Sequence, residues 1–206
     1  MSLVTHPAPT FTATAVMPDD RFDPGFSLAT LRGRYVVLLF YPLDFTFVCP
    51  SEILAFDEAL AEFQERDCEV VGVSVDSEYT HLAWKKTPPE QGGIGSIGFP
   101  LVSDLGKRIA RRYGILFNEE VALRGLFLID REGIVRHALV NDLPLGRSVQ
   151  EALRMLDALR FHEEKGDVCP ANWNQGDDGM QPTQDGVVDY LSRFAKAKTA
   201  PEEPVS

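Results

Sequence analysis

The sequence is poor in cysteine and in positive charge for its length. Only 3 of its 206 residues are cysteine, and they form no Cys-x-x-Cys pair. The chain is therefore not a small scaffold held together by disulfides, and a thioredoxin-like dithiol reductase is disfavoured. The 4 histidines are scattered as well, so the sequence gives no support for a zinc site or another bound metal.

Basic residues are outnumbered by acidic ones. Lys and Arg together number 20 against 31 Asp and Glu, which leaves a net charge of −11. Because nucleic-acid phosphates and anionic membranes bind clustered cations, we expect neither as a partner. The chain also lacks an apolar run near the roughly 18 residues of a membrane span and a basic segment followed by an apolar core at its start. We therefore expect a cytoplasmic protein with reduced thiols.

The remaining composition is that of an ordinary globular protein, 44% hydrophobic and 25% charged. A chain of this length can bury a large core in one domain. Composition changes after Lys165, where Gly, Asn, Asp and Pro become frequent and periodicity is lost. The sequence thus predicts a folded domain over residues 1–165 and a C-terminal arm over residues 166–206, with disorder expected at residues 200–206.

Apolar periodicity predicts alternating strands and helices in the first domain. After an irregular or hairpin lead-in over residues 1–30, strands are expected at residues 35–40, 69–75, 99–102, 125–130 and 134–140. Helices are expected at residues 50–66, 78–86, 105–113 and 148–164, with a short one near 187–197. Pro100 restricts its strand to the edge of the sheet. Strands that alternate with helices and end in a hairpin predict an α/β fold with a mixed sheet.

The most informative segment is FYPLDFTFVCP, which covers residues 40–50. It follows an apolar strand and precedes a helix, so Cys49 falls at or next to the helix N-cap, with Pro50 at the first helical position. Unpaired backbone N–H groups and the helix dipole favour an anion there. We expect the pKa of this thiol to be lowered, so that it exists largely as the nucleophilic thiolate.

Two neighbours in the same segment strengthen this interpretation. Thr46 lies one helical turn before Cys49, where its hydroxyl is able to donate to a thiolate. Pro42 is placed to shield the pocket from water. The alternative is that Cys49 is a small buried apolar residue, as most free cysteines are. The helix-start position and Thr46 favour a chemical role instead.

The pattern Pro-x-x-x-Thr-x-x-Cys at residues 42–49 resembles the active-site loop of the peroxiredoxins, and most closely that of the typical 2-Cys group. Further segments match in order along the chain: VSVDS at 73–77, THLAW at 80–84, RGLF at 124–127, NDLPLGRS at 141–148 and VCPA at 168–171. The resemblance implies a thioredoxin-like fold with an extended C-terminal arm. It also implies a thiol peroxidase that needs no metal or organic cofactor.

The resemblance assigns roles to individual residues. Cys49 matches the peroxidatic cysteine, which attacks a peroxide and becomes a sulfenic acid. Arg124 matches the arginine that supports the thiolate and binds peroxide, and Glu52 and Arg147 match residues that orient this cluster. From the sequence alone, Arg124 could instead be an exposed residue at a strand start, and Glu52 with Arg147 an ordinary exposed ion pair.

The other two cysteines differ in their expected roles. Cys169 lies in the polar arm and matches the resolving cysteine of a neighbouring subunit, where a flexible segment allows it to meet Cys49. Cys68 precedes a strand, and we expect no catalytic role for it.

The resemblance also implies substrates and partners. Hydrogen peroxide and small alkyl hydroperoxides are the expected substrates, and thioredoxin or a flavoprotein disulfide reductase is the expected reductant. A homodimer that assembles into a decamer is expected, with Phe45, Thr80 and Trp84 as candidate ring contacts. A redox-regulated holdase or a peroxide-signalling scaffold is the alternative function.

A glycine-rich segment, GIGSIG at residues 93–98, formally satisfies the dinucleotide-binding pattern G-x-G-x-x-G. It follows a helix and a proline turn instead of opening a helix after a strand, so nucleotide binding is disfavoured. The resemblance relates GGIG at 92–95 to the loop of peroxiredoxins that excess peroxide inactivates. Those proteins carry a Tyr-Phe pair where this chain has Tyr190 and Leu191, so we expect intermediate sensitivity.

Overall fold

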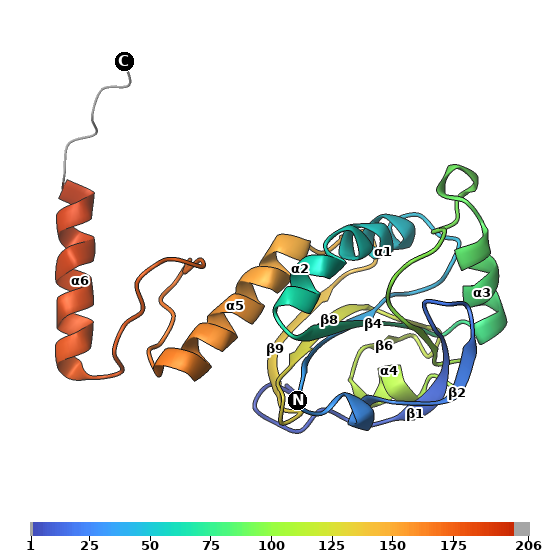
Figure 1. Ribbon diagram of the computed structural model, residues 1–206, viewed down its shortest axis with the longest axis horizontal. Coiled ribbons are helices and arrows are strands. Elements are labelled where there is room, and N and C mark those ends of the chain that lie inside the picture. The colour runs from blue at the N-terminus through green and yellow to red at the C-terminus, as the bar shows by residue number, and fades with distance from the viewer. Residues whose placement is uncertain (1, 200–206) are drawn as a thin grey trace, which may run out of the picture. The chain divides into compact units, whose positions relative to one another are not determined.

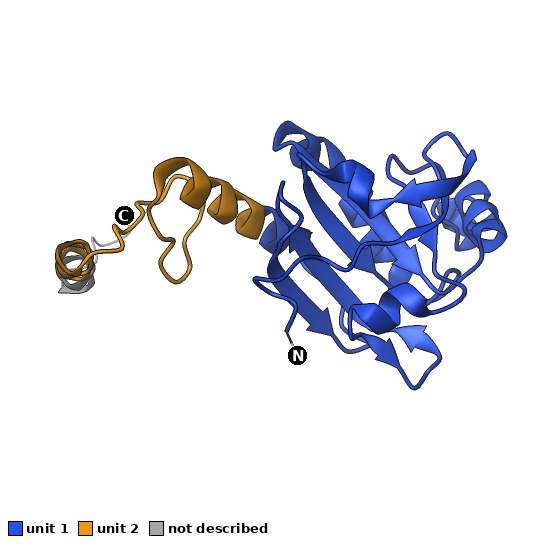
Figure 2. Ribbon diagram, turned by 90° about the horizontal axis from the view of Figure 1, so that it is seen from below, with its two compact units in different colours: residues 1–153 blue, residues 154–206 orange. Residues whose placement is uncertain are grey.

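The structure is a computed structural model that describes residues 2–199, with side chains for residues 2–193. The expected disorder of residues 200–206 lies outside the described residues. The chain divides into two compact units, residues 1–153 and residues 154–206 (Figure 2). The division falls inside helix α5 (Val149–Lys165), whereas the sequence places it after Lys165.

A seven-stranded mixed sheet in the order β2-β1-β5-β4-β3-β8-β9 forms the centre of the first unit (Figure 1). Its strands are β1 (Thr12–Val16), β2 (Phe22–Ser27), β3 (Tyr35–Phe40), β4 (Cys68–Ser74), β5 (Leu101–Ser103), β8 (Arg124–Ile129) and β9 (Val135–Asn141). Strands β3, β4 and β5 run parallel, whereas β8 and β9 on one side and β1 and β2 on the other pair antiparallel. The short β6 (Leu116–Phe117) and β7 (Val121–Ala122) pair separately. This confirms the thioredoxin-like α/β fold with a mixed sheet.

The helices agree with the predicted order but not with every predicted length. They are α1 (Cys49–Glu58), α2 (Leu60–Glu65), α3 (Glu78–Lys86), α4 (Arg108–Arg112), α5 and α6 (Gln184–Thr199), with 3-10 turns η1 (Leu28–Leu31) and η2 (Pro89–Gln91). The expected helix over residues 50–66 is two helices, because the backbone leaves helical geometry at Ala59 (φ −89°, ψ 5°). The expected helix over residues 105–113 shortens to α4, and Gly114 ends it with φ 71°.

A helix that crosses a bilayer is long and predominantly apolar. Within residues 2–199, no helix is both long enough and apolar enough to do so.

Strand β5 lies inside the sheet, so the expectation of an edge strand there is wrong. Its residues pair with β4 on one side and with β1 on the other. Pro100 precedes the first residue of the strand, and its carbonyl oxygen accepts a hydrogen bond from Gly72 N at 3.0 Å. The proline therefore removes no hydrogen bond from the strand itself. The lead-in forms the hairpin β1–β2, which covers the edge that β5 would otherwise present.

The core occupies both faces of β3, whose six residues are all buried. Figure 1 shows α1 and α2 over one face of the sheet and α4 over the other. On the α4 side, the ring of Tyr113 lies 5.0 Å from that of Phe40 and 4.8 Å from that of Phe127. On the other side, Phe56 of α1 stacks on Phe63 of α2 at 5.8 Å. Burial of these rings fixes α1 relative to the carboxyl end of β3.

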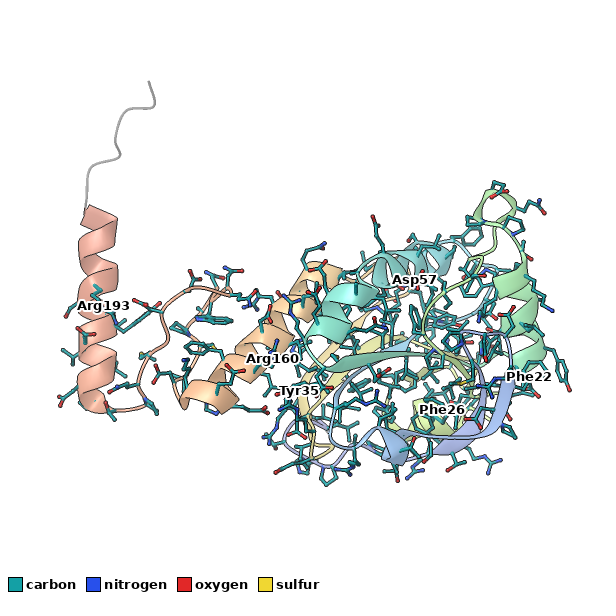
Figure 3. All side chains as sticks on the ribbon, viewed as in Figure 1. Phe22, Phe26, Tyr35, Asp57, Arg160 and Arg193 are labelled. Carbon is teal, nitrogen blue, oxygen red and sulfur yellow. The ribbon has the colours of Figure 1, made fainter. Side chains whose placement is uncertain are left out.

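The described part of the second unit has several local contacts. Trp173 is buried, its ring lies 4.9 Å from that of Phe161, and its Nε1 donates to Asp177 O at 3.0 Å. On α6, Arg193 forms an ion pair with Asp178 at 2.6 Å (Figure 3). Local contacts of this kind, and not a large core, stabilise the segment.

The loop between α3 and β5 is held close to the end of α3. Ile94 N donates to Trp84 O at 3.2 Å, and Gly95 N donates to Thr87 O at 3.1 Å. A Cβ atom at Gly93 would lie 1.8 Å from the Thr87 carbonyl oxygen. Glycine is therefore the residue that allows this close approach of two backbone segments.

We expect Gly93→Ala to lower the free energy of unfolding by roughly 2 kcal/mol or more, because backbone atoms must move to admit the methyl group. Urea unfolding followed by circular dichroism measures the change. Gly25→Ala is the control, since a Cβ there meets Asp23 Oδ1 at an ordinary 3.6 Å. Equal stability of the two variants would contradict the close packing of the loop.

Candidate active site

Cys49 lies between the loop that follows β3 and the body of α1. It is the first residue of the helix, Val48 is the N-cap, and Pro50 is the second helical residue. The sequence predicted this junction to within one residue, which is the ordinary uncertainty of helix boundaries. The Cys49 side chain is 0% exposed, so α1 begins with a completely buried sulfur.

The hydroxyl of Thr46 contacts this sulfur directly. Thr46 Oγ1 lies 3.0 Å from Cys49 Sγ and 2.8 Å from the carbonyl oxygen of Leu43. A hydroxyl has one proton, so it donates to one acceptor at a time and can turn to the sulfur when the sulfur is charged. Pro42 is buried in the same loop.

Arg124 brings a guanidinium group to the same sulfur. It is the first residue of β8, which pairs antiparallel with β3 and so begins beside the carboxyl end of that strand. Its Nη1 lies 3.4 Å from Cys49 Sγ, and its Nε donates to Leu143 O at 2.7 Å. Arg124 is 3% exposed, so it is not an exposed arginine at a strand start.

Glu52 holds two arginines in place one turn into α1. Its carboxylate accepts from Arg124 Nη1 at 2.7 Å, and from Nε, Nη2 and the backbone N of Arg147 at 2.8, 2.9 and 2.8 Å. Arg147 Nη1 also donates to the carbonyl oxygens of Phe40 and Gly125, at 2.7 and 2.6 Å. All three charged side chains are buried. Glu52 and Arg147 are therefore not an ordinary exposed ion pair.

The charges of this cluster do not cancel. Burial raises the pKa of Glu52, but the hydrogen bonds and charge of Arg147, with the charge of Arg124, outweigh burial and leave the pKa below its ordinary value. Glu52 therefore stays ionised, and two guanidinium groups face one carboxylate. Because an unpaired buried charge is costly, an anion at Cys49 Sγ is the species that neutralises the cluster.

A second buried network supports the loop, and its members had no predicted role. Asp44 Oδ2 lies 2.7 Å from His81 Nδ1, and Tyr41 OH donates to Asp44 Oδ1 at 2.9 Å. Burial raises the pKa of Asp44, and His81 opposes the rise. The backbone N of Asp44 also donates to Asp76 Oδ2 at 2.8 Å. The available signal is a carboxylate in the loop after an apolar strand, since a buried carboxylate needs partners.

Phe45 has an unusual backbone conformation between these two networks. Its φ of 52° lies in the left-handed region, which is costly for a residue with a side chain. Its ring lies 6.2 Å from that of Trp84, which is 0% exposed and donates from Nε1 to Gly92 O at 3.1 Å. Packing against α3 thus holds the loop in a sparsely populated conformation, as is common at functional sites.

The other two cysteines have different surroundings. Cys169 belongs to the second unit, is partly buried, and donates from Sγ to Ala158 O at 3.4 Å. Burial raises the pKa of the Cys169 thiol, and Arg154 opposes the rise. Cys68, at the start of β4, is buried, and burial raises the pKa of its thiol so that it stays protonated. A protonated, buried thiol is inert toward oxidants.

The glycine-rich segment at residues 93–98 lies between η2 and β5. It neither follows a strand nor opens a helix, as a phosphate-binding loop does. Among the residues that the structure describes, no three His, Cys, Asp or Glu side chains gather in a way that could hold a metal ion.

Two known families match this chain. The AhpC/TSA family matches residues 4–138, and the C-terminal domain of 1-Cys peroxiredoxin matches residues 158–193. Alkyl hydroperoxide reductase C of Helicobacter pylori strain J99 is 54% identical over 190 residues, which cover 92% of this chain and 96% of that protein. Peroxiredoxin-2 of Rattus norvegicus is 52% identical over 191 residues, which cover 92% of this chain and 96% of the relative.

Solved structures agree with these matches. The reduced 2-Cys peroxiredoxin of Plasmodium vivax is 54% identical and has a TM-score of 0.91, with 93% of this chain and 100% of that chain covered. Matches in sequence, in length and in fold thus extend over almost the whole molecule. The chain therefore belongs to the AhpC/TSA family and is a peroxiredoxin, a thiol-dependent peroxidase.

Proposed function

We propose that Cys49 is the nucleophile of this peroxidase and acts on hydrogen peroxide and small alkyl hydroperoxides. The Cys49 thiolate attacks the terminal peroxide oxygen, the O–O bond breaks, and the departing hydroxide or alkoxide takes up a proton. Cys49 becomes a sulfenic acid. One observation carries the proposal: the buried cluster of Glu52, Arg124 and Arg147 has an excess positive charge beside Cys49 Sγ.

Thr46 and Arg124 fit the charge that develops on the peroxide in the transition state. Their donor atoms lie 3.0 and 3.4 Å from the Cys49 sulfur, so a peroxide oxygen close to Sγ is within their reach. Donors fixed before the reaction need no reorganisation during it. Glu52 binds the guanidinium group of Arg124, and Arg147 binds Glu52, so both act through Arg124.

Cys169 of a neighbouring subunit is the proposed resolving cysteine. Its thiol attacks the sulfur of the Cys49 sulfenic acid, the sulfenic oxygen leaves as water, and a Cys49–Cys169 disulfide forms. Cys169 lies in the arm beside the backbone bridge between Val168 and Met180, which is one of the local contacts that hold this segment. Rearrangement of such a segment breaks few interactions.

A dithiol protein is needed to reduce the disulfide and complete the cycle. Thioredoxin is the proposed reductant, and a flavoprotein disulfide reductase is the alternative. Both donate two electrons and two protons through a mixed disulfide. Because the cycle consumes reduced thiols, we place the protein in the reducing cytoplasm.

The proposed assembly is a homodimer that forms a decamer. Aromatic side chains near the active-site loop are exposed, with Phe45 at 48% and Tyr79 at 68%. Thr80 follows Tyr79 on α3 and is partly exposed. Trp84 is completely buried, so it packs against Phe45 and is not itself a ring contact. The buried ionic cluster around Cys49 favours the peroxidase over the holdase or scaffold alternative, which needs no such cluster.

Cys49→Ser tests the central assignment. We expect it to abolish peroxide reduction in a thioredoxin-coupled assay, since a serine hydroxyl stays protonated at neutral pH and is a poor nucleophile. The far-ultraviolet circular dichroism should match that of the wild type. Substantial turnover by this folded variant would contradict the proposal.

Arg124→Ala tests the cation beside the sulfur. We expect the second-order rate of Cys49 oxidation to fall by about tenfold or more, because a transition-state donor and the charge that supports the thiolate are both lost. Stopped-flow mixing with hydrogen peroxide measures this rate. Arg111→Ala is the control, since Arg111 is exposed and pairs with Glu119 on the surface. Similar rates for both variants would remove Arg124 from the mechanism.

The identity of the resolving thiol is tested by electrophoresis without reductant. Peroxide-treated wild-type protein should migrate as a covalent dimer. That dimer should be absent in Cys169→Ser and present in Cys68→Ser, because Cys68 is buried and protonated. The reverse pattern would show that Cys68 is the resolving thiol.

A further inference from the structure

The buried position of Cys49 sets a problem for the resolving step. Its side chain is 0% exposed, yet a disulfide brings the two Cβ atoms to about 3.5–4.5 Å from each other. A second sulfur cannot approach that closely while the pocket stays closed. Because Cys49 is the first residue of α1, the sulfur is uncovered when the first turns of this helix open. The rate of disulfide formation therefore depends on what holds α1 in place.

Two polar contacts hold α1 at different points along its length. Near its start, Glu52 binds Arg124 and Arg147. Near its end, Asp57 Oδ1 accepts a hydrogen bond from the backbone N of Gly98 at 2.6 Å; Asp57 is labelled in Figure 3. The first contact belongs to the catalytic cluster, whereas the second has no part in binding peroxide.

The backbone N–H of Gly98 is a hydrogen-bond donor that is held in a fixed position. Its neighbours Ile97 and Phe99 are 2% and 1% exposed, so the backbone between them has little freedom. A Cβ at Gly98 would lie 2.5 Å from Leu60 Cδ2, which shows how closely the loop approaches the junction of α1 and α2. A carboxylate that accepts from a fixed N–H forms a charge-assisted bond, which is roughly twice as strong as a neutral one.

The break at Ala59 makes this contact important for α1. Helix α1 ends at Glu58, and Ala59 leaves helical geometry before α2 begins. The helical hydrogen bonds of α1 therefore do not continue without interruption into α2, and α1 can open as a unit of 10 residues. Asp57 lies next to the end of that unit. A contact at this point limits how far an opening that starts at Cys49 can spread.

We infer that Asp57 is a positioning residue for the resolving step, because its hydrogen bond to Gly98 pins the last turn of α1 and slows the uncovering of Cys49. The inference rests on the proposed function of Cys49 and Cys169. It concerns a residue outside the catalytic cluster and a step after the first oxidation. Figure 1 shows α1 and α2 lying in sequence over the same face of the sheet, with the loop after α3 nearby.

The hydrogen bond between Asp57 and Gly98 affects two competing reactions of the Cys49 sulfenic acid differently. In one, the Cys169 thiol displaces the sulfenic oxygen as water and forms the disulfide, which requires α1 to open. In the other, the sulfenic sulfur attacks a second peroxide, whose O–O bond breaks to give a sulfinic acid and an alcohol or water. The second reaction proceeds in the closed pocket. A stronger hydrogen bond between Asp57 and Gly98 therefore increases the fraction of sulfinic acid at a given peroxide dose.

The test compares Asp57→Ala and Asp57→Asn with Glu58→Ala in the full-length protein. Glu58 is exposed, and its side chain has no hydrogen bond or ion pair within the described part of the chain. Its variant therefore removes a charge from the same turn and leaves the hydrogen bond between Asp57 and Gly98 intact. Reduced protein is mixed rapidly with hydrogen peroxide, quenched with an alkylating reagent, and analysed by mass spectrometry for Cys49 sulfenic acid, disulfide and sulfinic acid.

Asp57→Ala is expected to form the disulfide roughly fivefold faster, with a matching fall in the sulfinic fraction, as the loss of one charge-assisted hydrogen bond implies. Asp57→Asn retains an acceptor of the same size and should fall between Ala and wild type. Glu58→Ala should match wild type. Hydrogen exchange should quicken in the amides of α1 and stay unchanged in β3, which a general loss of stability would not produce.

The outcomes separate this inference from the function on which it rests. If wild-type Cys49 gives no sulfenic acid with peroxide, the proposed function fails. The inference is overturned if Cys49 is oxidised at the same rate in every variant and both Asp57 variants form the disulfide no faster than wild type. An equal acceleration in Glu58→Ala would also overturn it, because the effect would then be one of charge. Should Asp57→Ala fold poorly, the comparison of Asp57→Asn with Glu58→Ala decides the question.

Discussion

The carboxylate of Glu52 determines the arrangement of the whole site. It belongs to α1, and it binds Arg124 of β8 and Arg147 of the segment before α5. Glu52 follows Cys49 by one helical turn, so the helix geometry that places the sulfur also places the carboxylate. Either arginine without this partner would be a buried unpaired charge. The same hydrogen bonds therefore stabilise the packing of three segments and set the electrostatic environment of the sulfur.

The parts of the site that could be predicted from the sequence are those encoded within one turn of the chain. Thr46 and Cys49 lie in a single strand–loop–helix segment, and local signals locate that segment. Arg124 is 75 positions from Cys49, and no local pattern shows that β8 begins beside the end of β3. Family resemblance was needed to connect them. Asp44 and His81, which are 37 positions apart, illustrate the limit, because each residue alone gives no sign that the other is its partner.

The errors in the predicted fold have the same origin. Pro100 suggested an edge strand, but the strand after it pairs with β1, whose residues lie far upstream. A proline just before a strand and a proline within a strand look alike in sequence, although only the second loses a ladder hydrogen bond. Similarly, the apolar periodicity continues through Ala59, where the backbone leaves helical geometry. Periodicity reports which face is buried, and it does not report whether the hydrogen bonds of the helix are continuous.

The excess positive charge around Cys49 has a different consequence for each oxidation state of the sulfur. A thiolate is an anion and balances that charge, and so does a sulfinate, whereas a protonated sulfenic acid is neutral and leaves it unbalanced. The intermediate of the proposed cycle is thus the state that the pocket accommodates least well. The surroundings proposed to activate this cysteine would also accommodate its irreversibly oxidised form. In the proposed cycle, charge therefore favours conversion of the sulfenic acid to an anionic end product, and opening of α1 is the route to the disulfide instead.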